Sequence, residues 1–442
     1  MNVVIIGCGP AGEAAAKTLR KLSKSQPDQN FSITIIEKEQ AGGLCLNKGC
    51  IPSKTLLEQV HGLSKLGLPI HWDNLQQKKN EVVDGIRSQL ETSLKTLKIN
   101  VVYGTARFIS PQEIEVENLS GKQTLHFDKA IIATGTESIF PPPLDQFRDE
   151  LLTSDEMLDV SRTPKSVIIV GGGAIGCEFA CLLHAAGSDV TIIELKNQLL
   201  PGEDLAIAQA LQKNYETRGI KVITETKVSA VQKLDKGWQV TLLNGLQLEA
   251  REILVSVGRS PNHTALQLEL AHIEMNGKIP KLNEYLQTSH PHIYVAGDAG
   301  TTRLAHAAAA QGEAIAAHIL GGKEKYDDRF VPRCLYSWPE VASVGSWKYE
   351  CEEKNEPVKT TRAFFKGSAK ALASGDSEGF VQIVLNPDTG KILGAQIIGP
   401  HATELIHIFS VALKTEMNIT QLSSVMFAHP TLSEVLKDAA KK

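Results

Sequence analysis

The chain has 442 residues, which is enough for about three domains of ordinary size. Its 46 Lys plus Arg and 50 Asp plus Glu give a net charge of −4, so no global positive field favours nucleic acid, and its hydrophobic fraction of 42% is typical of a globular protein. The sequence contains neither an apolar run of about 18 residues nor a charged leader before its first strand, so we expect no membrane span, no secretory signal and no transit peptide.

A strand, a tight turn, a helix and a second strand are predicted at the N-terminus. The turn is Gly7-x-Gly9-x-x-Gly12, and Glu37 lies at the end of the second strand. Glycines in this pattern let the backbone approach a pyrophosphate at the helix N-terminus, and the acid is placed to bind a ribose. Such a turn also serves packing alone, but the flanking strand, helix and acid together favour dinucleotide binding.

Two cysteines follow in the segment CLNKGC, and a helical stretch is predicted from Lys54 to Ile99, with an interruption near Leu68-Pro69. In a regular helix, Cys45 and Cys50 would lie too far apart for a disulfide, but a distorted entry turn at Gly49 would bring them into range. Thiols near a helix N-terminus are reactive. By spacing alone, however, two nearby cysteines are more often small core residues, and no zinc pattern is present.

A second unit of the same kind is predicted from about residue 166. It contains Gly171-x-Gly173-x-x-Gly176, and Glu194 ends its second strand. A carboxylate there would repel a 2′-phosphate, which favours NAD over NADP; the alternative is a solvated strand end. Two dinucleotide sites in one chain are typical of a tightly held FAD that exchanges hydride with a diffusible nicotinamide.

The remainder of the chain alternates strands and helices. An apolar strand precedes Asp298, and the helix after it is expected to end at Gly321-Gly322. From about residue 331, strands joined by a Pro-Asp-Thr-Gly turn lead into two final helices. We therefore predict an α/β fold whose first domain is split by the insertion of the second. The predicted boundaries are 1–147 and 262–330 for the first domain, 148–261 for the second and 331–442 for a C-terminal α+β domain.

These motifs together resemble the pyridine nucleotide-disulfide oxidoreductases, and most closely the dihydrolipoamide dehydrogenases among them. The resemblance covers nearly the whole chain, in the family's order. It rests on GGLCLNKGCIPSK around the cysteines, Ala133-Thr134-Gly135, Gly258-Arg259 with Pro261-Asn262, Ala296-Gly297-Asp298, and His429-Pro-Thr-Leu-Ser-Glu434. It implies two Rossmann-like dinucleotide-binding domains and a C-terminal α+β dimerisation domain, in a homodimer that uses FAD and NAD.

The resemblance also implies catalytic roles. Cys45 and Cys50 would form the redox-active disulfide, with Cys45 as the interchange thiol and Cys50 as the thiol nearest the flavin. His429 would be the base, oriented by Glu434. The alternative for the last segment is a helix capping box, Thr431-x-x-Glu434.

Further residues are expected at the cofactors. Lys54 would lie beside the flavin with Glu178 as its ion-pair partner; the alternatives are a helix-surface lysine and a helix-start acid. The residues expected to bind FAD are Gly7, Gly9, Gly12, Glu37, Lys54, Gly135 and Asp298. Those expected at NAD or near the flavin are Gly171, Gly173, Gly176, Glu178, Glu194 and Gly258.

The activity implied is oxidation of protein-bound dihydrolipoyl groups, with electrons passing through the disulfide and FAD to NAD⁺. The partners would be lipoyl domains of 2-oxo acid dehydrogenase complexes or of a glycine cleavage system, with no nucleic acid and no membrane. Seven cysteines in apolar or glycine-rich contexts favour a reducing, cytoplasmic location. The alternatives are a related NAD(P)H-dependent reductase of another disulfide or of a metal ion, and a non-catalytic structural subunit.

Overall fold

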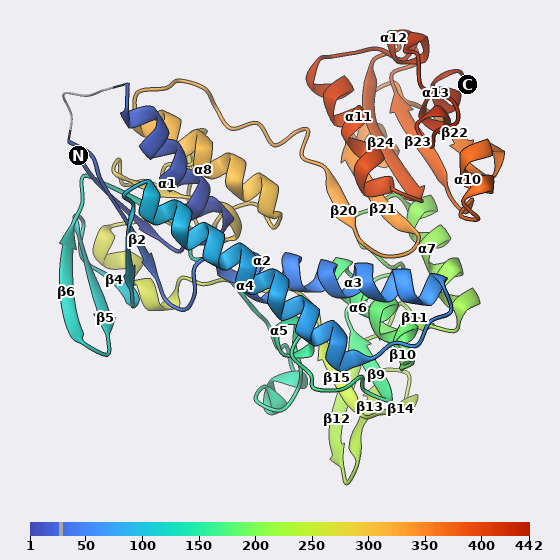
Figure 1. Ribbon diagram of the computed structural model, residues 1–442, viewed down its shortest axis with the longest axis horizontal. Helices are drawn as coiled ribbons and strands as arrows, with labels where there is room; N and C mark the ends of the chain where they lie inside the picture. Colours follow the sequence, from blue (N-terminus) through green and yellow to red (C-terminus); the bar gives the residue numbers. More distant parts are fainter. Residues whose placement is uncertain (26–29) are drawn as a thin grey trace. The chain divides into compact units, whose positions relative to one another are not determined.

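The computed structural model describes residues 1–25 and 30–442, which form two units (Figure 1). Each unit draws on separate stretches of the chain. Unit 1 comprises Met1–Thr55, Asn74–Ile139 and Gly258–Asp328, and unit 2 comprises Leu56–Asp73, Phe140–Val257 and Arg329–Lys442. The four domain boundaries expected from the sequence stay predictions.

The centre of unit 1 is a five-stranded parallel sheet in the order β19-β7-β1-β2-β3. Val and Ile make up more than half of its strand residues, and all of the strands but the edge strand β3 are largely buried, as parallel strands covered by helices require. The strands are β1 (Asn2–Ile6), β2 (Ser32–Glu37), β3 (Asn100–Tyr103), β7 (Lys129–Ile132) and β19 (Ile293–Val295).

Helices α1 (Pro10–Ser23) and α8 (Ala305–Ile319) run side by side in unit 1 (Figure 1). They approach closely because Gly312 has no side chain: a Cβ there would lie 2.2 Å from the carbonyl oxygen of Ala11. The predicted end of α8 is confirmed, since Gly322 N–H donates to Ala317 O (2.9 Å) and Gly321 has a φ of +94°.

The predicted helical stretch from Lys54 to Ile99 corresponds to α3 (Cys50–Lys65) and α4 (Trp72–Thr96), with α2 (Gly43–Lys48) before them, so the interruption near Leu68-Pro69 is confirmed. Smaller elements complete unit 1. They are the antiparallel sheet β4 (Thr105–Ser110), β5 (Glu113–Asn118) and β6 (Gly121–His126), the pairs β8 (Thr136–Ser138) with β16 (Arg259–Pro261) and β17 (Met275–Asn276) with β18 (Ile279–Pro280), and the short helices η2 (Thr264–Leu266), η3 (Leu268–Ala271) and η4 (Gly297–Ala299).

Unit 2 contains a second parallel sheet, in the order β11-β10-β9-β15. Its strands are β9 (Ser166–Val170), β10 (Asp189–Ile193), β11 (Lys221–Ile223) and β15 (Glu252–Val255). The associated elements are η1 (Leu144–Phe147), α5 (Ser154–Met157), α6 (Ala174–Ala185), α7 (Leu205–Arg218) and the antiparallel sheet β12 (Val228–Leu234), β13 (Gly237–Leu242) and β14 (Gln247–Ala250). The predicted α/β class with two strand–turn–helix units is confirmed.

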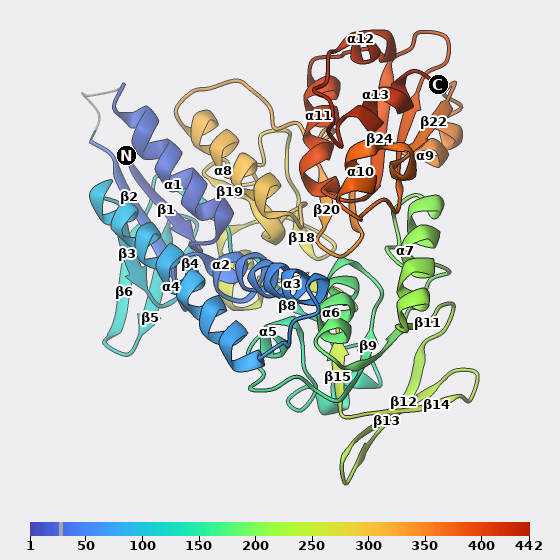
Figure 2. The ribbon, with the colours of Figure 1, turned by 45° about the vertical axis from the view of Figure 1, so that its right-hand side comes forward.

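The C-terminal part of unit 2 is an antiparallel sheet in the order β20-β21-β24-β23-β22. Helix α11 packs on β21 and β24, and α13 packs on β22 and β23 (Figure 2). Three helices end the chain where we predicted two, because the short α12 is set off by its own Asn418–Gln421 capping box. The elements are β20 (Arg333–Leu335), β21 (Glu340–Gly345), α9 (Lys348–Glu353), β22 (Lys359–Phe364), η5 (Phe365–Gly367), α10 (Ala369–Ala373), β23 (Phe380–Leu385), β24 (Ile392–Gly399), α11 (Ala402–Lys414), α12 (Ile419–Ser424) and α13 (Glu434–Ala440). In the described part of the chain, no helix combines the length and the apolar composition that crossing a membrane demands.

Candidate functional site

Cys45 and Cys50 form a disulfide, with their Cα atoms 4.7 Å apart. The two residues lie in consecutive helices, α2 and α3, and the expected distortion of the chain at Gly49 is confirmed. Helix α2 ends at Lys48, and Gly49 breaks the chain before α3 begins at Cys50. Glycine is required here by a close approach, since a Cβ would lie 2.9 Å from the Leu44 carbonyl oxygen.

Asn47, between the two cysteines, holds α2 in place. Its Nδ2 donates to the carbonyl oxygens of Ala41 (3.0 Å) and Gly43 (2.9 Å), and its Oδ1 accepts from Arg87 Nε on α4 (2.8 Å). Neither Asn47 nor Arg87 was expected at the site from the sequence. A polar residue within a six-residue segment bounded by reactive cysteines was the signal that could have identified Asn47.

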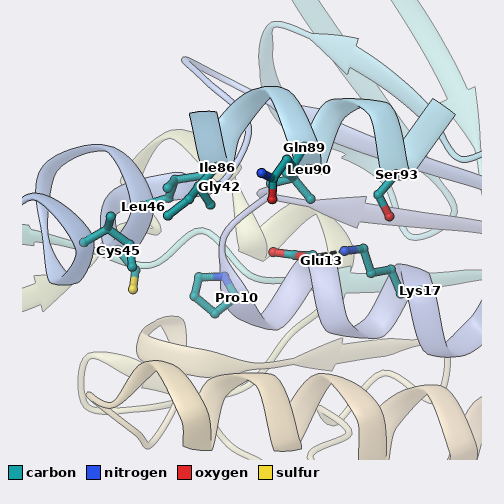
Figure 3. A pocket seen from close by; sticks show the side chains of 11 residues that line it. Pro10, Glu13, Lys17, Gly42, Cys45, Leu46, Ile86, Gln89, Leu90 and Ser93 are labelled. Atoms are coloured by element: carbon teal, nitrogen blue, oxygen red, sulfur yellow. Dashed lines mark hydrogen bonds and ion pairs between the residues drawn. The ribbon is translucent and has the colours of Figure 1, made fainter. Parts of the chain in front are cut away.

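A pocket of about 470 Å³ opens beside Cys45 in unit 1 (Figure 3). Helices α1 and α4 form facing walls, and the Cys45 sulfur points into the space near Pro10. Leu46, Ile51, Ile86 and Leu90 make part of the lining apolar. The remaining lining residues are Gly42, Gln89, Ser93 and the ion pair of Glu13 and Lys17, whose Oε1 and Nζ lie 2.7 Å apart. One cysteine of the disulfide is thus open to a ligand of moderate size.

The first glycine turn joins β1 to α1. Gly7 has a φ of +107°, and a Cβ on Gly12 would lie 2.0 Å from the Gly7 carbonyl oxygen, so neither position accepts a larger residue. Gly9 is the N-cap of α1 and supplies no side-chain acceptor to the first-turn N–H groups. The buried Glu37 carboxylate accepts the Cys8 N–H at Oε2 (2.8 Å). Burial raises the pKa of the Cys8 thiol to about 11, which keeps it neutral.

Polar groups farther along unit 1 fit a bound FAD. The hydroxyl of Thr134 is buried and has no hydrogen-bond partner among the described residues. Gly135 follows with a φ of +66° and open space at its Cβ position. Burial raises the pKa of the half-buried Asp298 carboxyl, which Arg303 partly offsets. An orphaned hydroxyl and a poorly solvated carboxyl beside an uncapped helix suit the hydroxyl groups and pyrophosphate of a dinucleotide.

The second glycine turn repeats this geometry in unit 2. A Cβ on Gly176 would lie 2.0 Å from Gly171 O, and Gly173 is the N-cap of α6. Glu194 accepts the Gly172 N–H at Oε2 and the Lys196 N–H at Oε1, both at 2.7 Å. Its side chain is buried, so the alternative of a solvated strand end is wrong. The carboxylate still has lone pairs for ribose hydroxyls, so the turn fits NAD.

Glu178 and Lys54 lie in different units. Glu178 is buried on α6, and its Oε1 accepts the Tyr336 N–H at 3.0 Å. Lys54 is half-buried in the first part of α3, so a freely exposed helix-surface lysine is not what the structure contains. Their ion pair stays a prediction. Gly258, with a φ of +132°, precedes Arg259, which donates to Thr136 O (3.0 Å) and so ties β16 to β8.

His429 lies at an exposed bend, as predicted, and its Nδ1 is 3.0 Å from Glu434 Oε1. The Thr431 N–H donates to Glu434 Oε2 (3.0 Å), and this bond, followed by the bond from His429, lowers the pKa of the Glu434 carboxyl. Helix α13 begins at Glu434 with Ser433 as its N-cap and no side-chain cap, so of the alternative capping box only the bond from the Thr431 N–H to Glu434 is present. The carboxylate orients the imidazole and leaves Nε2 available.

Comparison with known families agrees with these two cofactor turns and the disulfide. Residues 1–314 match the model of the Pyridine nucleotide-disulphide oxidoreductase family, and residues 331–440 match the dimerisation domain of the same family. The chain belongs to this family.

Several relatives of this oxidoreductase are similar over their whole length. A dihydrolipoyl dehydrogenase of Bacillus subtilis is 37% identical over 99% of this chain and 98% of its own, and one of Chlamydia pneumoniae is 35% identical over 99% and 96%. Among solved structures, LpdA from Mycobacterium tuberculosis has a TM-score of 0.92 at 25% identity, covering 100% of this chain and 99% of its own. The HOCl-induced flavoprotein disulfide reductase RclA from Escherichia coli, as its Cu(II) complex, has a TM-score of 0.90 at 27% identity, covering 100% and 98%.

Proposed function

We propose that this oxidoreductase is an FAD-dependent dihydrolipoyl dehydrogenase, which oxidises protein-bound dihydrolipoyl groups and reduces NAD⁺. The observation that carries the proposal is the Cys45–Cys50 disulfide with Cys45 open to a partly apolar pocket. An apolar wall suits the hydrocarbon arm of a lipoyl group. The curated relatives that share the full length of the chain bear the same activity in their names.

The thiol half of the reaction would begin at Cys45. One substrate thiolate attacks the Cys45 sulfur, the Cys45–Cys50 bond breaks, and Cys50 leaves as a thiolate. The second substrate thiolate then attacks the mixed disulfide, so the dithiol becomes a disulfide and the two cysteines carry its two electrons. His429 of the partner subunit would accept the proton of the substrate thiol at Nε2, while Glu434 holds its Nδ1–H.

Bound FAD would supply the two-electron chemistry that connects this dithiol to NAD⁺. The residues that would hold FAD are Gly7, Gly9, Gly12, Glu37, Lys54, Gly135 and Asp298. A second set would hold NAD⁺ or lie close to the flavin: Gly171, Gly173, Gly176, Glu194, Gly258 and Glu178. The glycines admit the pyrophosphates to the two helix N-termini, and the two buried acids would accept ribose hydroxyls.

Steady-state turnover of dihydrolipoamide with NAD⁺ and with NADP⁺ tests the function. We expect efficient turnover with NAD⁺ and a strong preference over NADP⁺, because Glu194 would repel a 2′-phosphate. Turnover of another disulfide or of a Cu(II) salt with NADPH, in the absence of dihydrolipoamide activity, would instead support a reductase like the one named in the Escherichia coli neighbour. Inactivity of FAD-loaded protein with all three would support a structural subunit.

The family's dimerisation domain at residues 331–440 supports a homodimer in which each site uses both chains. His429 is at an exposed bend, where it is available to a second chain. An isologous interface would supply the same base to both sites. The expected partners are lipoyl domains of 2-oxo acid dehydrogenase complexes or of a glycine cleavage system, in the cytoplasm.

Mixing inactive Cys45→Ser chains with inactive His429→Gln chains tests the shared site. Heterodimers should regain activity, because one of their two sites combines an intact disulfide with an intact His429. Subunit exchange verified by mass spectrometry without any recovery of turnover would contradict the model.

A further inference from the structure

The loop of residues 336–339 connects β20 to β21 and contacts helices α6 and α3. Its first residue, Tyr336, donates its N–H to the buried Glu178 carboxylate of α6 (3.0 Å). Two residues later, the Trp338 indole stacks on the His61 ring of α3, with centroids 4.7 Å apart and planes only 4° from parallel. One four-residue loop therefore holds both a predicted site carboxylate and the helix that begins at Cys50.

Trp338 itself is held by residues of α6 and α7. Its N–H donates to Cys181 Sγ on α6 (3.4 Å), and its carbonyl oxygen accepts from Arg218 Nη1 on α7 (2.7 Å). The Arg218 guanidinium also lies 5.4 Å from the indole centroid, within cation–π range. The two hydrogen bonds fix the Trp338 backbone, and the indole then lies against both the Arg218 guanidinium and the His61 ring.

His61 shares a face of α3 with the predicted site residues. At 100° per residue, Cys50, Lys54 and His61 fall within about 40° of one another around the helix axis. The helix is continuous from Cys50 to Lys65. A constraint at His61 therefore limits the rotation of the whole face that carries Cys50 and Lys54.

We propose that His61 and Trp338 are positioning residues for the proposed reaction, in which their stack fixes the rotation of α3 while the same loop fixes Glu178. This inference rests on the proposed function for its catalytic consequence but not for its structural one. Loss of the stack lets α3 rotate and fray, which misplaces the reactive face by a small distance. Displacements of about 1 Å at a reacting centre cost up to a hundredfold in rate.

The burial of His61 makes the stack sensitive to acid. Burial is the main cause that lowers the pKa of His61; Lys65 on α3 and Arg218 on α7 lower it further, while Glu58 on α3 and Asp376 after α10 oppose them. The ring is therefore neutral at neutral pH. Because the folded pKa lies below the unfolded value, the stack contributes fully above about pH 6.5 and its contribution falls as the pH drops through the folded pKa.

Hydrogen–deuterium exchange and steady-state kinetics on the FAD-loaded enzyme test the proposal. His61→Ala removes the stack, whereas His61→Phe keeps an aromatic ring and removes the titration. The matched control is His318→Ala in unit 1, where His318 stacks on Tyr285 at 4.3 Å. Both histidines are half-buried, so a general cost of losing such a stack affects them alike.

We expect His61→Ala to speed amide exchange in α3 and to lower kcat with NAD⁺ about tenfold, with KM for dihydrolipoamide unchanged. His61→Phe should restore slow exchange and kcat and remove the acid-induced increase in exchange. The control should change neither quantity.

Unchanged exchange in α3 for His61→Ala, or failure of His61→Phe to restore it, overturns the proposal. If His61→Ala does not fold, Trp338→Leu and Trp338→Phe serve as the disrupting and restoring pair. The exchange readout remains decisive even if the wild type lacks dihydrolipoamide activity, in which case only the proposed function fails.

Discussion

The two glycine turns of this chain have almost the same backbone but different surroundings. Gly9 and Gly173 have φ and ψ angles of −75°, −174° and −74°, −172°, and both third glycines face the carbonyl oxygen of the first. Both terminal acids accept the N–H that follows the first glycine. Local sequence therefore reproduces one dinucleotide cradle twice.

The difference lies in what covers the middle glycine. A Cβ on Gly43, at the start of the disulfide segment, would lie 2.7 Å from the Gly9 Cα, so the chain packs onto its first turn. Around Gly173, no described heavy atom lies within 4 Å of the Cβ position, beyond the atoms adjacent in its own helix and chain. The first turn, onto which the disulfide segment packs, thus suits a cofactor that stays bound. The second turn, which has free space at Gly173, suits a cofactor that exchanges.

Adding a methyl group at Gly43 and, separately, at Gly173 gives the largest expected effect. Gly43→Ala should abolish FAD retention and lower Tm, because Gly43 has a φ of +58° and its new methyl would meet the Gly9 backbone. Gly173→Ala should fold and keep FAD but bind NAD⁺ about tenfold more weakly, since its methyl would stand only where the pyrophosphate goes. Flavin absorbance after gel filtration and NAD⁺ titration measure both. FAD loss in Gly173→Ala would contradict the distinction.

A variant that impairs the thiol step but not the step with the nicotinamide gives the next largest effect. His429→Gln should lower dihydrolipoamide turnover by about 10²–10⁴ and leave NADH oxidation by a dye acceptor unchanged, because only the thiol step needs the base. The control is His126→Gln: His126 is also 73% exposed and its Nδ1 lies 3.3 Å from the Glu113 carboxylate. Equal losses in both variants would show that the exposed pairs act only on stability.

Substitution of Glu194 should affect NAD⁺ binding alone, and substitution of Glu37 should affect FAD binding alone. Glu194→Gln should raise KM for NAD⁺ about tenfold and narrow the gap to NADP⁺, with FAD content unchanged. Glu37→Gln should weaken FAD retention and leave the NAD⁺ affinity of FAD-saturated protein unchanged. Parallel flavin content and KM measurements decide this, and a wild type that prefers NADPH would refute the role of Glu194.

The smallest effect concerns Asp298 in the FAD-free chain. Burial raises the pKa of the Asp298 carboxyl, so its charged form opposes folding. Below about pH 4 the carboxyl is protonated in both states and folding carries no such cost. The free energy of unfolding then decreases as the pH rises through the folded pKa. Asp298→Asn should therefore raise the Tm of FAD-free protein by a few degrees at pH 7 and weaken FAD binding. Calorimetry with and without FAD checks both signs, and a lower Tm without FAD would contradict the first.

Patterns carried by neighbouring residues were predictable, and contacts between distant segments were not. The glycine turns, the exposed bend at His429 and the end of α8 follow from local backbone preferences, so their residues were identified in advance. The bond from Arg87 to Asn47 was not, because its two residues lie 40 positions apart in the sequence. The stack of His61 on Trp338 was equally hidden, since its partners belong to segments with no shared motif.

The short spacing of the two cysteines has a consequence for repeated turnover. A cross-link five positions apart closes a small ring, so it removes only about 2 kcal/mol of chain entropy from the unfolded state, roughly half of what a long loop gives. Opening it costs the fold little. Meanwhile the Asn47 bonds to Ala41, Gly43 and Arg87 keep α2, which carries Cys45, in place without the cross-link. The freed thiols then remain at a high effective concentration toward one another, and the ring can close again in each cycle without refolding the segment.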